Sequence, residues 1–421
     1  MQKPFNIVVA VGWSSYNKGD AAILLGLLKT IKEFYPESKI SILSSSPKED
    51  RKYYSKYGDT HERLFNTFYK KKPKIVNIVI VILKILYYLI WSTNTNIPII
   101  KSDKEILNLY RKADLVISGG GGYLGGNKIF NAVAFLFPLY VAKKIGKKVY
   151  VCAQSVEPFN NWITKFITMF FLNRIDLITV REPYSIQTLK SAHIKKPVYL
   201  TADTAFLLDA ESVDVGYHLL NKSGVPRDNK LRIGITVTKW NFPRSKDPTI
   251  KQLQYVTSIA DAIEEIIKEM DATIVFFPNA IFPPKDDDRI ISHQIKEKIK
   301  ELYTKNVFVL TEDYSPEQLK SMISTMDVFI GTRMHSNIFA TSMNVPTLAI
   351  AYEKKHYGIM EMIGLQDYVI DISNINTEQL VMLVKKLIEN RELVQQILKN
   401  GIALIKKRAI QNVEMMNDLL K

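Results

Sequence analysis

The sequence has 421 residues, a formal net charge of +15 and a single cysteine, Cys152. This length exceeds what one hydrophobic core usually organises, so it predicts two domains. One cysteine excludes an intramolecular disulfide, and we expect no metal site because the sequence offers no ligand cluster. The basic charge favours anionic partners such as phosphorylated substrates or acidic lipid. Nucleic acid is not expected as a partner, because zinc-finger spacing and RNA-binding signatures are absent from the sequence.

An apolar run from Phe5 to Trp13 lies near the N-terminus. No small-residue cleavage site follows it, and the polar stretch from Ser14 to Asp20 leads directly into a helical pattern. This run is therefore interpreted as a first buried strand and not as a signal peptide. The single cysteine fits a reducing compartment, so we expect a cytoplasmic protein, with a secreted protein that lacks disulfides as the alternative.

Short apolar runs alternate with helical patterns along nearly the whole chain. This alternation predicts an α/β fold in which helices cover both faces of parallel sheets. The first series of expected strands is Ile7–Val11, Lys39–Leu43, Asp114–Ser118, Val149–Cys152 and Leu177–Val180. The second series is Arg232–Val237, Thr273–Phe277, Val307–Leu310, Val328–Ile330 and Pro346–Ala351.

The two series predict two Rossmann-like domains. We place the N-terminal domain at residues 1–208 and the C-terminal domain at residues 231–390. The polar segment 209–230 is the expected hinge, and residues 391–421 are expected to form a C-terminal helix.

The segment Ile75–Trp91 is almost wholly apolar and follows four lysines. It is shorter than the about 20 residues that span a bilayer, and Lys84 interrupts it, so a transmembrane helix is not expected. Two interpretations remain. The segment is either a helix packed into the N-terminal domain or a helix lying on an acidic membrane surface.

Asn17, Gly19 and Asp20 follow the first expected strand and precede a helix. In doubly wound folds this turn faces the ligand crevice. A glycine here allows close approach of the backbone, and N–H groups at a helix start attract anions. Alternatively, Asp20 only caps the helix.

Four consecutive glycines, Gly119–Gly122, follow another expected strand and favour contact of Gly120 and Gly121 with a sugar or phosphate. Their spacing resembles a dinucleotide fingerprint, but the strand is not the first of its domain, so no nicotinamide cofactor is expected. Gln154 ends the next strand and could bind sugar hydroxyls or form only a polar turn. Arg181 closes the following strand and could reach a ligand or pair with a nearby carboxylate.

The segment Gly331–His335 follows a strand of the second series and opens a helix. Because a helix N-terminus binds anions and disfavours an added positive charge, His335 is a candidate catalytic base. Tyr352 and Lys355 follow the next expected strand. Arg333 and Lys355 could then hold the two anionic ends of one small ligand.

Taken in order, these motifs resemble the polysaccharide pyruvyl transferase family over nearly the whole chain. The resemblance rests on the Asn17 turn, the glycines from Gly119, Gln154-Ser155-x-x-Pro158, Arg181 before Glu182 and Ser185, Ala202-Asp203-x-Ala205-Phe206, Arg333-x-His335, Val345-Pro346, Tyr352 and Lys355. One departure is Gly-Thr-Arg-Met-His, where the family usually has Gly-Met-Arg-Leu-His.

The resemblance implies two Rossmann-like domains of the GT-B type with a ligand cleft between them. It implies that phosphoenolpyruvate is the donor, that pyruvate is moved to two hydroxyls of a sugar as a ketal in surface or exopolysaccharide biosynthesis, and that no cofactor is needed. Arg181 and Lys355 match donor-binding positions, and His335 matches the proposed base. Asp203 and Asp247 are the candidates for the general acid.

Two other functions stay open. The architecture equally permits a GT-B glycosyltransferase that uses a nucleotide sugar. The basic apolar segment also suits a non-catalytic, membrane-associated assembly protein. The acceptor of a pyruvyl transferase could be a lipid-linked repeat unit or a nucleotide sugar, and the sequence does not distinguish them.

Overall fold

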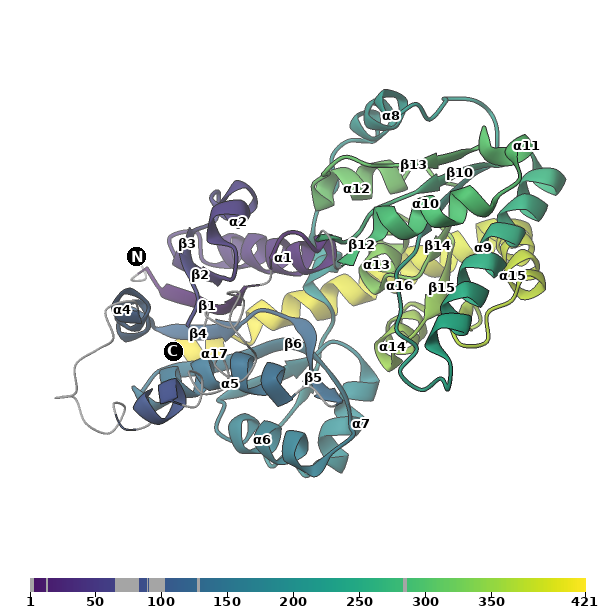
Figure 1. Cartoon of the computed structure of the whole chain (residues 1–421). Helices are drawn as coiled ribbons and strands as arrows, with labels where there is room; N and C mark the ends of the chain where they lie inside the picture. The colour runs from purple at the N-terminus through teal and green to yellow at the C-terminus, as the bar shows by residue number, and fades with distance from the viewer. Residues whose placement is uncertain are drawn as a thin grey trace. The chain divides into compact units, whose positions relative to one another are not determined.

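The computed structural model describes residues 4–12, 14–64, 83–88, 90, 103–126, 129–282 and 286–421. The chain divides into two compact units (Figure 1). Unit 1 consists of Met1–Ser15, Ile23–Leu207 and Arg408–Lys421. Unit 2 consists of Tyr16–Ala22 and Leu208–Lys407. Each unit is built around its own parallel sheet.

Unit 1 contains an eight-stranded sheet in the order β3-β2-β1-β4-β6-β7-β8, with β5 paired to β6. Its strands are β1 (Asn6–Gly12), β2 (Lys39–Ser44), β3 (Asp59–Glu62), β4 (Leu115–Ser118), β5 (Gly121–Gly126), β6 (Lys148–Phe159), β7 (Leu177–Val180) and β8 (Tyr199–Leu200). Its helices include α2 (Pro47–Tyr54), α4 (Lys104–Lys112), α5 (Ile129–Lys144), α6 (Trp162–Leu172), α7 (Pro183–Ser191) and α17 (Asn417–Leu420). Strands β4 and β7 are buried at every position, as expected for parallel strands covered on both faces.

Unit 2 contains a six-stranded parallel sheet in the order β13-β10-β9-β14-β15-β16. Its strands are β9 (Arg232–Thr236), β10 (Thr273–Phe276), β13 (Val307–Val309), β14 (Val328–Gly331), β15 (Thr347–Ala351) and β16 (Val369–Asp371), beside the short antiparallel pair β11 (Ile281–Phe282) and β12 (Asp286–Asp287). Its helices are α8 (Val213–Lys222), α9 (Pro248–Met270), α10 (Asp288–Lys298), α11 (Glu301–Thr304), α12 (Pro316–Ile323), α13 (Met334–Ser342), α14 (Lys354–Ile363) and α15 (Thr377–Glu389). Two parallel sheets with helices confirm the predicted α/β class.

Two helices contribute to both units. Helix α1 (Lys18–Phe34) has its first turn in unit 2 and the rest in unit 1, and α16 (Arg391–Glu414) ends in unit 1. Within unit 1, the buried side chain of Asn412 on α16 accepts hydrogen bonds from the hydroxyls of Thr179 and Thr201, at 2.8 Å each, and donates to the Ala202 carbonyl at 2.9 Å. These contacts fix the end of α16 to the edge of the first sheet.

Both sheets reverse their strand order beside the first strand of the unit. The reversal lies between β1 and β4 in unit 1 and between β9 and β14 in unit 2. In doubly wound sheets, ligands bind outside the carboxyl ends of the strands at this position. We therefore expect a ligand site of unit 2 at the segments that follow β14 and its neighbours.

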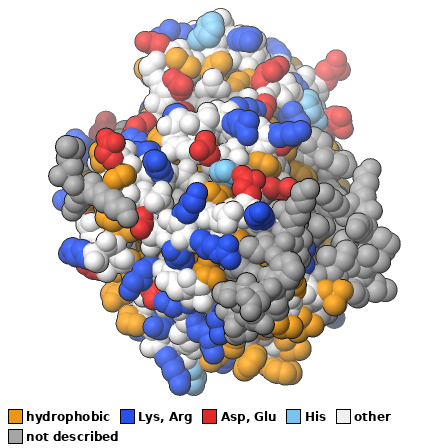
Figure 2. Space-filling view, turned by 90° about the vertical axis from the view of Figure 1, so that its left-hand side faces the viewer, with side chains coloured by type: hydrophobic (Ala, Val, Ile, Leu, Met, Phe, Trp, Pro, Cys, Tyr) orange, Lys and Arg blue, Asp and Glu red, His pale blue; other side chains and the backbone are white. Residues whose placement is uncertain are grey.

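Figure 2 shows lysine and arginine side chains spread over the visible face, while hydrophobic side chains gather at its lower edge. Most of the apolar segment Ile75–Trp91 lies outside the described residues. Of that segment, residues 83–88 and 90 are helical, and Leu83 and Leu86 are exposed while Tyr88 is buried. In the part of the chain that the structure describes, no helix is both long enough and apolar enough to cross a bilayer.

Candidate active site and family

The imidazole of His335 lies against the backbone of Gly19. Helix α13 begins at Met334 directly after β14, which places His335 in its first turn with 9% of its surface exposed. A methyl group at Gly19 would lie 2.1 Å from Nδ1 and 2.3 Å from Cγ of His335. Such distances are far inside van der Waals contact, so the ring occupies the place of a side chain at position 19. Gly19 and His335 both belong to unit 2.

The first turn of α1 has its backbone donors satisfied within the protein. The Asn17 side-chain oxygen accepts from the amides of Gly19 at 3.0 Å and Asp20 at 3.2 Å, and the Lys18 amide donates to the Asn279 carbonyl at 2.8 Å. Asn17, and not Asp20, is therefore the cap of this helix. The side chain of Lys18 is buried and forms an ion pair with Asp313.

Arg333, the residue before α13, is held by two carboxylates. Its Nε and Nη2 donate to Oδ1 of Asp288 at 3.1 and 2.6 Å, and Nη2 also donates to Asp286 at 2.5 Å. Asp288 is buried, and its other oxygen accepts from the amides of Asn279 and Ala280 at 3.0 and 2.8 Å. Burial favours the neutral form of Arg333, but Asp288, followed by Tyr352 and Asp286, keeps its pKa well above the usual value. Asp288 therefore fixes a charged guanidinium on the residue two positions before His335.

Tyr352 and Lys355 follow β15, the strand paired with β14. The Tyr352 ring lies 4.3 Å from the rings of both Trp240 and His356, measured between centroids. Burial raises the pKa of Tyr352, and the charges of Lys355 and Arg333 oppose that rise. Lys355 forms an ion pair with the carboxylate of Glu353. The ends of β14 and β15 thus carry two basic groups, a phenol and an imidazole in one part of unit 2.

His356 is a second, fully buried histidine at this edge of the sheet. Its ring nitrogens lie 3.2 Å from the carbonyl oxygens of Glu353 and Thr332. Burial, helped by the charge of Lys355, lowers the pKa of His356 to about 3. Both carbonyls oppose this shift, because only the charged ring can donate to the two of them, but the effect of burial is larger. Its place between two strand ends makes His356 a packing residue.

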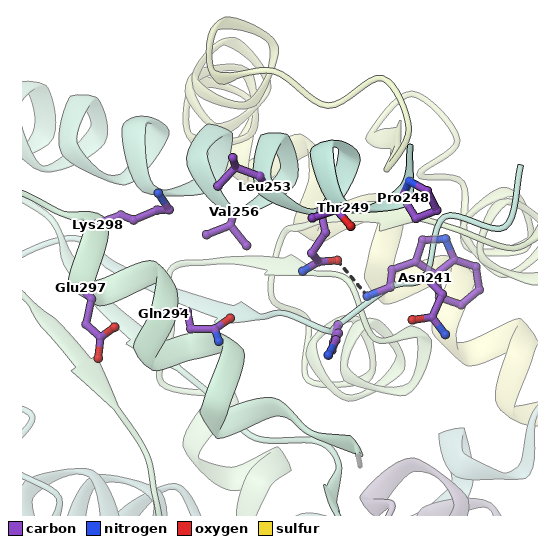
Figure 3. Close-up of a pocket in the computed structure, with 11 residues that line it drawn as sticks. Asn241, Pro248, Thr249, Leu253, Val256, Gln294, Glu297 and Lys298 are labelled. Carbon is purple, nitrogen blue, oxygen red and sulfur yellow. Dashed lines mark hydrogen bonds between the residues drawn. The ribbon is translucent and has the colours of Figure 1, made fainter. Parts of the chain in front are cut away.

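A groove of about 730 Å³ lies next to Trp240. Pro248, Thr249, Leu253 and Val256 of α9 form one wall, and Gln294, Glu297 and Lys298 of α10 form the other (Figure 3). The Trp240 amide donates to Oε1 of Gln252 at 3.0 Å, which fixes the loop after β9 to this wall. The Trp240 ring, which lines the groove, also packs against Tyr352 at the end of β15.

Arg181 and Asp203, expected as donor ligand and general acid, pair with each other in the interior of unit 1. Nη1 of Arg181 lies 2.6 Å from Oδ2 of Asp203, and its Nε donates to the Ser155 hydroxyl at 2.8 Å. Both side chains are at most 1% exposed. Asp247, the other candidate acid, caps α9 by accepting from the amides of Thr249 and Ile250. In the described arrangement, the charges of Arg181 and Asp203 balance each other inside unit 1, and Asp247 caps α9.

The other motif residues of unit 1 pack closely around the start of β5. A side chain at Gly120 would approach Ile23 to 3.0 Å and the Ala153 carbonyl to 3.1 Å. The amide nitrogen of Gln154 donates to the carbonyls of Gly121 and Ser155 at 2.7 Å each, and among the described residues its buried Oε1 has no hydrogen-bond partner. Ala153 has a φ of 45°, a strained value for a residue with a side chain. Gly120 and Gln154 therefore have packing roles that the sequence did not reveal.

The structure groups the expected site residues by unit. Unit 2 brings together Asn17, Gly19, Asp20, Arg333, His335, Tyr352 and Lys355, and unit 1 holds Gly120, Gly121, Gln154, Arg181 and Asp203. The sequence did not single out Trp240, Asp286, Asp288 or Glu353, although the run of three aspartates from Asp286 was an available signal. No group of three or more His, Cys, Asp or Glu side chains is arranged to hold a metal ion in the described part of the chain.

The family model described as polysaccharide pyruvyl transferase matches residues 17–354. The chain belongs to the polysaccharide pyruvyl transferase family. The match includes the Asn17 turn, the glycine turn of unit 1 and the Arg333–His335 segment, and it ends one residue before Lys355. The chain is also similar to the amylovoran biosynthesis protein AmsJ of Erwinia amylovora, with 24% identity over 388 residues, which are 90% of this chain and 91% of AmsJ.

Solved structures of other enzymes are similar to this pyruvyl transferase family member in fold. A glycosyltransferase from Rickettsia africae ESF-5 matches with a TM-score of 0.61 and 13% identity over 100% of both chains. The UDP-GlcNAc 2-epimerase from Neisseria meningitidis, bound to UDP-GlcNAc, matches with a TM-score of 0.58 and 14% identity over 98% of this chain and 99% of that one. At such identities the likeness shows the fold alone, a GT-B-like pair of Rossmann-like units.

Proposed function

We propose that the protein transfers pyruvate from phosphoenolpyruvate to two hydroxyls of a sugar, forming a ketal during surface or exopolysaccharide biosynthesis. Family membership supports a transferase, and the similarity to an amylovoran biosynthesis protein supports the polysaccharide context. The observation that carries the proposal is the placement of His335 against Gly19, next to an Arg333 that Asp288 holds in position. We assign the reaction to the cytoplasm, where phosphoenolpyruvate is made.

The anionic groups of the donor would take the place of the carboxylates that now pair with Arg333 and Lys355. Phosphoenolpyruvate carries a carboxylate and a phosphate, and Arg333 and Lys355 offer a planar fork and a point charge for them. Asp286 is 49% exposed and can leave Arg333, whereas the buried Asp288 stays and keeps the guanidinium aligned. Glu353 would likewise release Lys355. The donor therefore replaces the carboxylates of Asp286 and Glu353, and the basic groups of Arg333 and Lys355 each keep an anionic partner.

The chemistry needs a base at the acceptor hydroxyl. A proton adds to C3 of phosphoenolpyruvate and leaves C2 electron-poor. His335 accepts the proton of one sugar hydroxyl as its oxygen bonds to C2. The C2–phosphate bond then breaks with its electrons on the phosphate, and a second hydroxyl bonds to C2 and gives its proton to that phosphate. The proton taken up by His335 balances the one that solvent supplied to C3. A positioned base of this kind contributes about 10²–10⁴-fold to the rate.

We assign the acceptor sugar to the groove beside Trp240. The side chains of Asn241, Gln252 and Gln294 offer amide donors and acceptors that suit sugar hydroxyls, and the groove is large enough for a sugar. Its connection to Tyr352 through Trp240 would bring the acceptor toward Lys355 and His335. Both a lipid-linked and a nucleotide-linked sugar fit this assignment.

The proposal is tested by measuring product formation with phosphoenolpyruvate and with nucleotide sugars as donors in separate reactions. The protein would be incubated with phosphoenolpyruvate or with nucleotide sugars, together with candidate acceptors of both kinds. We expect acceptor-dependent release of phosphate and the mass gain of a pyruvate ketal on the acceptor. Release of nucleotide from a nucleotide sugar without use of phosphoenolpyruvate would instead identify a glycosyltransferase, and no turnover of either donor would favour a non-catalytic assembly protein.

A further inference from the structure

Helix α6 of unit 1 presents large apolar side chains to solvent. Trp162 is 75% exposed, Ile163 41% and Phe166 61%. Side chains three and four positions apart on a helix are neighbours, so Phe166 adjoins both Ile163 and Trp162, and the three form one exposed apolar surface, defined here as the α6 face. Helix α6 lies at the lower end of unit 1 in Figure 1, the end where hydrophobic side chains gather in Figure 2.

The buried side of the same helix carries polar residues. Thr164 and Thr168 are fully buried, four residues apart, and in the described part of the chain their hydroxyls have no hydrogen-bond partner. Phe171 and Leu172 are buried on the same helix, so its inner side is apolar in part, whereas an ordinary surface helix buries apolar residues and exposes polar ones. Exposing a tryptophan and a phenylalanine while burying two threonines costs stability. This arrangement indicates that the α6 face is covered when the protein acts.

Basic residues lie on α6 and at its end, and α6 itself carries no acidic residue. Residues 158–175 contain no Asp or Glu. Lys165 lies on α6 and donates to the Ser191 carbonyl at 3.2 Å, and the exposed Arg174 follows the helix with its guanidinium 3.8 Å from the Phe170 ring centroid. The amide of the exposed Lys195 donates to the Asn173 side chain at 2.8 Å, which brings Lys195 to the end of α6. The local charge is therefore positive.

We propose that the α6 face docks unit 1 onto an anionic lipid bilayer. Trp162, Ile163 and Phe166 would enter the boundary between headgroups and acyl chains, where tryptophan in particular is favoured. Lys165 and Arg174 would then meet lipid phosphates. Two copies of this chain pairing through the α6 face would bring the same basic groups together, so charge favours the bilayer over self-association.

The proposal does not depend on the reaction proposed above, because it rests on α6 and its neighbours alone. It also differs from the prediction for Ile75–Trp91, since α6 is a separate segment. If both proposals hold, docking through α6 gives the enzyme access to a lipid-linked acceptor.

The experiment is flotation of the full chain with vesicles of phosphatidylcholine, with and without about one third phosphatidylglycerol. The wild type should float with the anionic vesicles at low salt and much less with the neutral ones. A Trp162→Ser/Phe166→Ser variant should lose roughly tenfold or more of this binding, because two large apolar side chains are removed. Matched control substitutions at exposed apolar positions of unit 2, Leu302→Ser and Leu404→Ser, should leave binding unchanged.

Charge and self-association are measured in parallel. Lys165→Gln/Arg174→Gln should reduce the preference for anionic over neutral vesicles. The binding of this variant should also fall less than that of the wild type as salt is raised. Circular dichroism melts would establish that each variant is folded. Failure of the wild type to float with anionic vesicles at low salt would overturn the proposal. So would equal flotation of wild type and Trp162→Ser/Phe166→Ser, or a wild-type dimer that becomes monomeric in that variant without vesicle binding by either.

Discussion

The His335 ring occupies the space in which a side chain at Gly19 would stand. The nearest ring atom to a Cβ built at Gly19 is Nδ1, at 2.1 Å, so this nitrogen faces the first turn of α1. The first turn is itself fixed by the Asn17 side chain and the Asn279 carbonyl. The position of the candidate base is therefore set by a helix that begins more than three hundred residues earlier in the chain.

Gly19→Ala should destabilise the protein and lower turnover. Because the new methyl overlaps the ring, either His335 or the turn must move, at a cost of about 1–3 kcal/mol in the free energy of unfolding. Urea unfolding of both single variants and the double variant measures the coupling. In a His335→Gly background the same alanine should cost less, since the ring and its Cβ are gone. Equal costs in both backgrounds would show that the contact is not the cause.

Arg181→Ala should unfold the protein more readily and not simply weaken donor binding. It would leave Asp203 buried without its charge partner, an effect of about 3–5 kcal/mol. Arg181→Met combined with Asp203→Leu removes both charges, so we expect much of the loss to be recovered. Denaturant titration of the single and double variants decides. A single variant as stable as the wild type would contradict the structural role.

Lys355 and Glu353 should have opposite effects on donor affinity. Lys355→Met removes one charged contact and should weaken phosphoenolpyruvate binding by roughly tenfold to a hundredfold. Glu353→Gln removes the carboxylate that competes for Lys355 and should strengthen it. Calorimetric titration with phosphoenolpyruvate measures both. Lys385→Met is the control, because Lys385 pairs with Glu269 on other helices of unit 2. Unchanged affinity in the Lys355 variant would exclude Lys355 as a donor ligand.

His356 should make the protein less stable in mild acid. Its pKa is lowered from 6.5 to about 3 in the folded chain, so below pH 6.5 the unfolded chain binds a proton that the folded chain does not. Stability from this group is therefore complete above pH 6.5 and lost as pH falls, with a slope approaching about 1.4 kcal/mol per pH unit. Urea unfolding at several pH values should show a shallower decline for His356→Asn. Parallel declines would contradict the assignment.

Local patterns in the sequence predicted the sheets well. The expected strand Leu177–Val180 coincides with β7, and Arg232–Val237 exceeds β9 by one residue. Such runs are readable because parallel strands are buried on both faces and remain apolar throughout. The strand end at Gly331 and the helix start before His335 were also predicted correctly, because a glycine and a change of periodicity mark them locally.

Partners distant in the chain could not be predicted. Nothing near Arg333 in the sequence indicates that Asp286 and Asp288 hold it, and nothing near Gly19 indicates that His335 fills its side-chain space. Both relationships arise from the strand order and not from local periodicity. The exposure of helix α6 could not be predicted either, because a large apolar residue such as Trp162 is ordinarily expected to face the core.

The most direct test of the central claim is parallel measurement of phosphate release and ketal product from phosphoenolpyruvate by wild type, His335→Ala and His218→Ala. His218 is an exposed histidine on α8 and serves as the matched control. We expect wild type and His218→Ala to form product at equal rates, and folded His335→Ala to be slower by about 10²–10⁴-fold. Product formation by folded His335→Ala at the wild-type rate would contradict the role of His335, and no ketal from the wild type with either lipid-linked or nucleotide-linked acceptors would contradict the reaction itself.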